Sequence, residues 1–103
     1  MGRSIMHDKG DGTCYLCMLL HGDHGRRTVL EEHHVMGGTA DRRLSERYGL
    51  KVYLCPQHHR IHREESPHQD RATNALLHRK AQEAFERAHS HGEWMEAFGR
   101  NYI

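Results

Sequence analysis

The sequence predicts a small α+β domain that a bound metal ion holds together. Two segments, residues 28–35 and 50–55, have the pattern of short β-strands, and residues 70–89 repeat apolar side chains at helical spacing. Cysteine and histidine residues also stand in two pairs at the spacing of metal ligands. With 103 residues, of which 36% are apolar, the chain makes one domain. Its core is so small that we expect an additional cross-link, such as a bound metal ion, to stabilise it.

The first third of the chain supplies one cysteine pair and one strand. Residues 1–13 are polar and rich in glycine, so we expect a flexible N-terminus. The segment CYLC at residues 14–17 follows as a Cys-x2-Cys knuckle. Residues 28–35 carry β-branched and apolar side chains and predict the first strand, which the glycine pair at 37–38 ends.

The middle of the chain predicts a short helix and the second strand. Residues 39–49 have a helical pattern, with Thr39 or Asp41 as its N-terminal cap and Gly49 just past its end. Residues 50–55 alternate apolar and polar side chains and predict the second strand.

The remaining chain is expected to be mostly helical. Pro56 suits the first turn of a helix, and residues 57–65 can continue it until Pro67 breaks it. Residues 70–89 predict an amphipathic helix, and residues 93–99 predict a final turn or two that ends in glycine.

These elements divide the chain into three parts. Residues 1–13 are the flexible segment, and residues 14–68 form the metal-bound ββα core. Residues 69–103 form a C-terminal helical extension that packs on the core or provides the surface of a homodimer.

Two ligand pairs define a structural metal site. Cys14 and Cys17 form one knuckle, and Cys55 and His58 form a Cys-x2-His knuckle. Thiolates and imidazole at such spacing suit tetrahedral Zn²⁺, as in a treble-clef arrangement. Zinc would stabilise the fold, because the free energy of metal binding becomes free energy of folding. In the alternative interpretation the cysteines are only buried thiols.

The cysteine count also indicates a compartment. The chain has three cysteines, an odd number, and its first residues lack the apolar run of a signal peptide. No segment approaches the roughly 20 apolar residues of a membrane span. We therefore expect a cytoplasmic protein with no membrane partner. A net charge of +1 means that contact with DNA has to come from a local patch.

Four further histidines gather around one strand and one knuckle. His33 and His34 point to opposite faces of a strand, and His59 lies one helical turn from His62. Strand and helix histidines can therefore hold a second metal ion while one more serves as a base. The alternative is that they are structural. We place the other histidines on the surface or in loops: His7, His21, His24, His78, His89 and His91.

The order Cys-x2-Cys, His-His-Val, Gly-Gly, strand and Leu-Cys-x2-His-His resembles the HNH endonuclease family, whose core is a ββα-metal finger. The resemblance covers residues 14–68. The segments SERYGLKVYLCPQHH and AQEAFERAHSHGEWMEAFGRNYI are also similar to a group of small phage and prophage HNH-type proteins. For a phage protein the compartment would be the cytoplasm of the host cell.

The resemblance implies a metal-dependent endonuclease that hydrolyses DNA phosphodiester bonds. His34 matches the general base of the family, His33 the first ligand of a catalytic metal ion, and His59 the ligand from the helix. The third ligand is His62 or His68. The ion would be a divalent cation such as Mg²⁺, Mn²⁺, Ni²⁺ or Zn²⁺.

One departure from the family pattern favours another function. The family has an asparagine that helps to hold the base histidine, and its place here falls near Leu50. No asparagine stands between Cys14 and His68. The alternative is a non-catalytic treble-clef zinc module that binds nucleic acid or a protein partner.

Arginines near the two metal sites are candidates for DNA binding. Arg42 and Arg43 stand on the short helix, and Arg60 and Arg63 follow the second knuckle. Contacts with phosphates would give affinity without sequence specificity. Because acidic residues are interleaved with them, the alternative is an ordinary solvated face.

Overall fold

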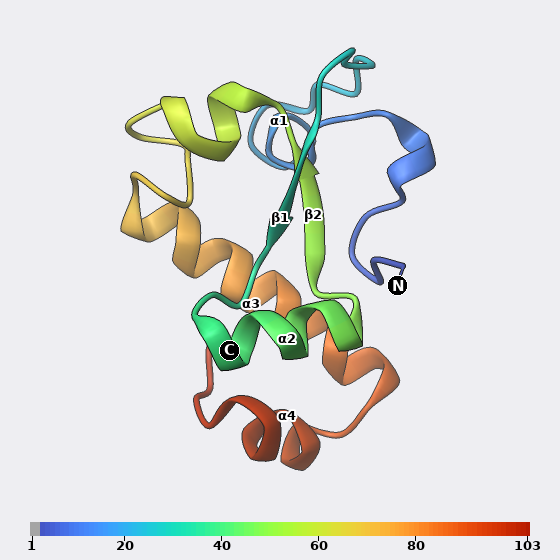
Figure 1. Ribbon diagram of the computed structural model, residues 1–103, viewed down its shortest axis with the longest axis vertical. Helices are drawn as coiled ribbons and strands as arrows, with labels where there is room; N and C mark the ends of the chain where they lie inside the picture. Colours follow the sequence, from blue (N-terminus) through green and yellow to red (C-terminus); the bar gives the residue numbers. More distant parts are fainter. Residues whose placement is uncertain (1–2) are drawn as a thin grey trace.

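The computed structural model of the chain describes residues 3–103 and confirms a small α+β architecture (Figure 1). Its sheet has two antiparallel strands, β1 (Glu31–His34) and β2 (Lys51–Leu54), which lie within the predicted segments and are shorter. The helical elements are η1 (Lys9–Asp11), α1 (Tyr15–His21), α2 (Thr39–Tyr48), η2 (Gln57–Ile61), α3 (Arg71–Ala88) and α4 (His91–Phe98).

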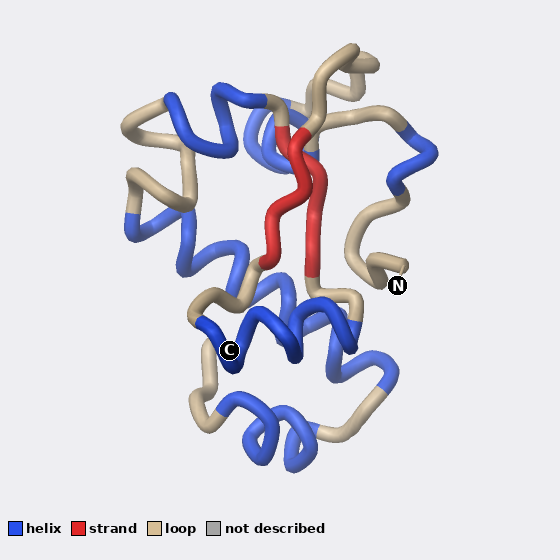
Figure 2. The backbone as a smooth tube through the Cα atoms, viewed as in Figure 1, coloured by secondary structure: helices blue, strands red, loops and turns tan. Residues whose placement is uncertain are grey.

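The sheet lies between two groups of helices. In Figure 1 the strands run side by side through the middle, with α1 near one end and α2 and α4 near the other. Figure 2 shows the loops that connect these helices to the two strands. Val52 and Leu54 of β2 are fully buried in one apolar cluster with Leu77 and Phe85 of α3 and Trp94 of α4. The C-terminal helices therefore contribute to the core that supports the sheet.

The ends of α2 are set by glycines. Gly49 takes the left-handed conformation at its C-terminal end, with φ 71°, as predicted. A side chain there is also excluded by space, because a Cβ atom would lie 2.3 Å from the carbonyl oxygen of Arg3. The predicted cap by Thr39 or Asp41 is wrong. The cap position is Gly38, and both predicted residues lie inside the helix, where their backbone is already helical.

The segment after Pro56 is shorter than the predicted helix. It forms one wide turn, η2, which a hydrogen bond of 2.8 Å from the amide of His62 to the carbonyl of Gln57 closes. The backbone of His62 is extended, and its ring nitrogen Nδ1 accepts a hydrogen bond from the amide of Glu64 at 3.1 Å. The helix therefore ends well before Pro67, because the side chain of His62 binds the backbone that a longer helix would need.

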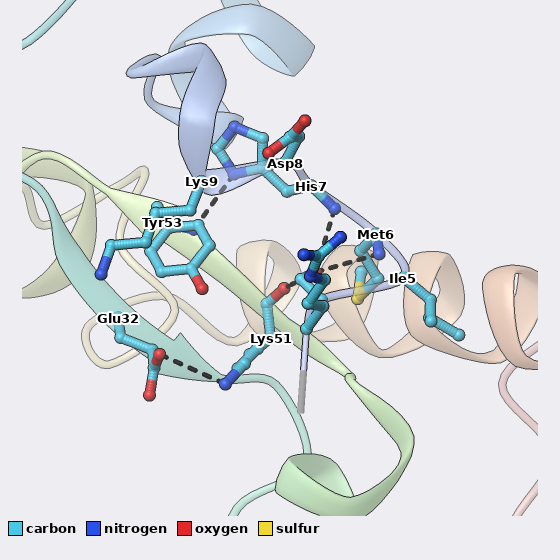
Figure 3. A pocket seen from close by; sticks show the side chains of 10 residues that line it. Ile5, Met6, His7, Asp8, Lys9, Glu32, Lys51 and Tyr53 are labelled. Carbon is cyan, nitrogen blue, oxygen red and sulfur yellow. Dashed lines mark hydrogen bonds and ion pairs between the residues drawn. The ribbon is translucent and has the colours of Figure 1, made fainter. Parts of the chain in front are cut away.

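Residues 3–13 lie along β2 as an arm, where the sequence predicted a flexible segment (Figure 3). His7 is 6% exposed. Its Nδ1 accepts a hydrogen bond from the amide of Tyr53 at 3.1 Å, and its Nε2 lies 3.2 Å from the hydroxyl of Thr13. His7 therefore lies in a loop segment, as the prediction allowed, but it is buried and not at the surface. The arm and β2 border a cleft of about 880 Å³.

Candidate metal centres

Cys14, Cys17, Cys55 and His58 lie close together, as the sequence predicted. Nδ1 of His58 lies 3.7, 3.3 and 3.6 Å from the sulfurs of Cys14, Cys17 and Cys55. The sulfurs of Cys17 and Cys55 are 4.0 Å apart. Tetrahedral bonds of about 2.3 Å to sulfur and about 2.0 Å to nitrogen would separate such ligand atoms by roughly 3.5–3.8 Å. The cluster can therefore bind a metal ion such as zinc.

Three local structures present these four ligands. Cys14 caps α1, where its sulfur accepts a hydrogen bond from the amide of Cys17 at 3.5 Å. Cys55 follows β2 directly, and His58 lies in η2. A backbone hydrogen bond of 2.8 Å from His59 to Cys55 closes the turn between them. One helix start, one strand end and one turn thus meet at a single point.

The thiol of Cys17 needs a nearby cation to become a good ligand. Burial, followed by the hydrogen bond with Cys14, raises the pKa of Cys17 to about 12. A thiol with this pKa stays protonated at neutral pH unless a positive charge stabilises the thiolate. Arg27 donates a hydrogen bond to the sulfur of Cys17 at 3.4 Å and supplies part of that charge. A bound metal ion would supply the rest.

A carboxylate supports the imidazole of His58. Oε1 of Glu65 lies 2.8 Å from Nε2 of His58 and 2.6 Å from Nε2 of His21. The hydrogen bonds with His21 and His58 hold the pKa of Glu65 at about 2, so it is ionised and accepts the proton on Nε2. This fixes the tautomer in which Nδ1 of His58 presents its lone pair to the sulfurs, an arrangement common at metal sites.

His33, His59 and His68 form a second group, which we call the histidine triad. The ring centre of His33 lies 5.3 Å from the ring centre of His59 and 5.0 Å from that of His68. His33 is 6% exposed, and among residues 3–103 its Nε2 has no hydrogen-bond partner. A buried nitrogen without a partner is costly. Coordination of a metal ion would satisfy it.

The lowered pKa values of two triad members, His33 and His68, also suit a metal ion. Burial, followed by the neighbouring imidazoles of His68 and His59, lowers the pKa of His33 to about 3. Burial also lowers the pKa of His68. Neutral imidazoles carry the lone pair that metal ions require. At neutral pH, therefore, His33 and His68 both have a lone pair to donate.

A carboxylate also orients His59. Its Nδ1 lies 2.8 Å from Oε1 of Glu31, two residues before His33 on the same strand. Arg60 binds both oxygens of that carboxylate, and the hydrogen bonds from Arg60 and His59 lower the pKa of Glu31 to about 2. A carboxylate behind a histidine orients the opposite nitrogen toward a metal ion. The histidine triad thus has the support expected of ligands.

The structure separates the two candidates for the third ligand. His62 accepts backbone hydrogen bonds through Nδ1, both at 3.1 Å, and its ring stacks 6.1 Å from that of His58. Of the two alternatives, His62 is therefore the one that is not brought together with His33 and His59. His68 is brought there, with its Nε2 3.3 Å from Nε2 of His59.

His34, the predicted general base, stands at the edge of the same region. Its Nε2 lies 2.9 Å from Oε1 of Glu46 on α2 and 3.6 Å from Oε1 of Glu32 on β1. Its side chain is 13% exposed and borders a cleft of about 350 Å³, which we call the histidine cleft. The cleft is lined by His33, His34, His59, His68, Arg42 and Glu32, among others.

The four predicted DNA-binding arginines differ in their surroundings. Arg42 lines the histidine cleft. Arg60 is bound to Glu31, with hydrogen bonds of 3.1 Å from both Nε and Nη2, so its charge is already paired. Arg43 and Arg63 are exposed. Arg42 is thus the arginine best placed to meet a ligand in the cleft.

Sequence reasoning missed the charged residues that hold the histidines. One had a signal, because Glu31 stands two residues before His33 and so shares its face of the strand. The contact between His34 and Glu46 spans 12 residues and depends on how α2 packs on β1, so no local sequence pattern predicts it. The missed residues are Glu31, Glu46, Lys51 and Glu65.

No family model, curated protein or solved structure matches the chain. In the part of the chain that the structure describes, no helix is long and apolar enough to cross a membrane. The chemistry of the two candidate metal centres is therefore the basis for proposing a function.

Proposed function

We propose that the protein is a metal-dependent endonuclease of the HNH type, which hydrolyses DNA phosphodiester bonds. One observation carries the proposal: three histidines whose ring nitrogens could hold a metal ion and a fourth histidine backed by carboxylates border the same cleft. In this proposal the four-ligand cluster holds a structural zinc ion, and the core is a treble-clef, ββα-metal finger.

The histidine triad would hold the catalytic metal ion. A set of three imidazoles favours Zn²⁺ or Ni²⁺ over Mg²⁺ or Mn²⁺, which prefer oxygen ligands. When bound, the ion would stabilise the negative charge that develops on the phosphate and on the leaving 3′ oxygen. The protein's part is to keep His33 buried and neutral and to orient His59 through Glu31.

His34 is the proposed general base. A neutral imidazole accepts a proton from water as the water attacks phosphorus. His34 follows the triad residue His33 in β1, so the proton acceptor and a metal ligand reach the cleft from one strand. Arg42 adds a positive charge in the cleft, and we propose that it binds a phosphate next to the one that is cleaved.

The test is cleavage of supercoiled plasmid by the zinc-loaded protein with Mg²⁺, Mn²⁺, Ni²⁺, additional Zn²⁺ or EDTA. The wild type should relax or linearise the plasmid in a metal-dependent way, most strongly with Ni²⁺ or Zn²⁺. His34→Ala should retain zinc and the fold but lose cleavage. His24→Ala removes an exposed histidine of the loop before β1 and is the matched control, with wild-type cleavage expected.

Two results would count against the proposal. Equal cleavage by His34→Ala would remove this residue as the base. Absence of cleavage with every metal, in a folded protein that retains zinc, would favour the alternative of a non-catalytic zinc module that binds nucleic acid or a protein partner.

A further inference from the structure

One nitrogen of His34 is held by a carboxylate. Nε2 of His34 lies 2.9 Å from Oε1 of Glu46, which is hydrogen-bond distance, and 3.6 Å from Glu32, which is longer than a hydrogen bond. An ionised carboxylate can only accept a hydrogen bond. A neutral His34 must therefore carry its proton on Nε2, and its lone pair is then on Nδ1.

A buried lysine fixes the carboxylate in turn. Lys51 pairs with His34 across the two strands, and it is 4% exposed. Its Nζ lies 3.1 Å from both oxygens of Glu46 and 3.4 Å from Glu32; the pair with Glu32 is drawn in Figure 3. A buried ammonium group is costly unless it is paired. Lys51 and Glu46 therefore hold each other in place beneath His34.

We propose that Glu46, fixed by Lys51, is the positioning residue for His34. It sets the tautomer and the orientation of the imidazole, so that Nδ1 is the nitrogen that receives the proton. This inference rests on the proposed function, in which His34 is the base. The same logic operates wherever a carboxylate behind a histidine holds its ring for proton transfer.

The same residues are also close enough to be considered as a metal site, since Glu32, His34 and Glu46 lie within 4.8 Å of one another. Lys51 argues against a metal ion there. Its ammonium group already contacts both carboxylates and offsets part of their negative charge. The geometry therefore favours an ion-paired support for His34 over a third metal centre.

The experiment measures the tautomer of His34 and the cleavage kinetics on the zinc-loaded protein. Long-range ¹H–¹⁵N NMR at mildly alkaline pH reports which ring nitrogen of His34 carries the proton. The variants are Glu46→Gln, which keeps an oxygen acceptor, and the double variant Glu46→Ala with Lys51→Met, which removes the carboxylate without leaving a buried unpaired cation. Glu83→Gln, a carboxylate change on α3, is the matched control.

The wild type and Glu83→Gln should show the tautomer with the proton on Nε2. The double variant should populate both tautomers, and its kcat should fall on the order of 10²-fold with KM unchanged. Glu46→Gln should retain the tautomer and most of kcat. A role limited to stability would lower the melting temperature of the variants without changing the tautomer or kcat.

Two outcomes would overturn the inference: a wild-type proton on Nδ1, or a double variant with unchanged tautomer and unchanged kcat. A failure of the proposed function would give a different result from a failure of this inference. If the wild type cleaves no DNA with any metal, the nuclease proposal is lost, and the NMR data alone decide whether Glu46 orients His34.

Discussion

The Nε2 atoms of His59 and His68 lie 3.3 Å apart. Because Glu31 accepts a hydrogen bond from Nδ1 of His59, a neutral His59 has its lone pair on Nε2. That lone pair lies close to another imidazole nitrogen and to Nε2 of buried His33, which has no hydrogen-bond partner among the residues that the structure describes. A cation between the three rings would satisfy all of them, which makes the histidine triad the most testable feature of the site.

The first prediction concerns metal binding by the triad. His68→Ala should weaken binding of Ni²⁺ or Zn²⁺ at this site by more than the roughly 10–100-fold that loss of an outer partner costs, because a direct ligand is removed. His62→Ala is the matched control, since its side chain binds backbone amides and lies outside the triad. Calorimetric titration of the zinc-loaded protein measures both affinities.

The zinc content of both variants shows whether a change in affinity comes from loss of the structural zinc site. Structural zinc, counted by mass spectrometry, should remain at one per chain in both variants. If His62→Ala weakened the second metal as much as His68→Ala does, the assignment of the third ligand would be wrong.

A second prediction concerns the four-ligand cluster. Binding of zinc by such a site contributes on the order of 10 kcal/mol, comparable to the whole stability of a small domain of about 5–15 kcal/mol. A strong chelator, or the variant Cys55→Ser, should therefore abolish cooperative unfolding as followed by circular dichroism. His21→Ala removes a hydrogen bond to Glu65 and a ring contact with His58 but no ligand of the cluster, so it should lower the melting temperature without loss of the fold. Cooperative melting of metal-free protein would contradict the structural role of zinc.

The third prediction concerns the start of α3 and its dependence on pH. The side chain of Asp70 accepts hydrogen bonds from the hydroxyl of Thr73 at 2.7 Å and from its amide at 2.9 Å. These bonds lower the pKa of Asp70 below its usual value. The unfolded chain then binds the proton more readily, so the stabilisation is present above the ordinary pKa and is lost as pH falls through the folded pKa.

The variant Asp70→Asn separates this effect from the other titrating groups. Asparagine offers the same cap oxygen without a charge and does not ionise in this range, so it stands in for the protonated aspartate. Melting temperatures of wild type and variant should therefore converge as the pH is lowered through the acid range, with Asp70→Ala below both at neutral pH. A constant difference between wild type and Asp70→Asn at every pH would falsify the assigned origin of the shift.

The sequence was sufficient where the chemistry is local. The spacing within each knuckle places two ligands on one turn, and it correctly predicted that Cys14, Cys17, Cys55 and His58 meet. The glycine at position 49 marked the end of α2 in the same way, because only the backbone conformation of that residue was at issue.

The sequence was insufficient where a contact depends on packing between elements. Glu46 on an amphipathic helix is expected to face solvent, and its contact with His34 follows only from the position of α2 against β1. His7 is buried because the arm that carries it lies along β2, and no periodicity in the sequence predicts that position. The choice of His68 over His62 required the extended turn after η2, since both residues follow His59 at short distances in the sequence.

The last prediction concerns DNA binding in the histidine cleft. Arg42 lines the cleft, so Arg42→Ala should weaken DNA binding uniformly across sequences and lower the slope of log affinity against log salt by about 1. Fluorescence anisotropy with a labelled duplex measures this in the His34→Ala background, where cleavage does not interfere. Arg79→Ala removes an exposed arginine of α3 and should leave affinity and slope unchanged. Equal effects of the two substitutions would mean that general positive charge, and not a phosphate bound in the cleft, accounts for any affinity.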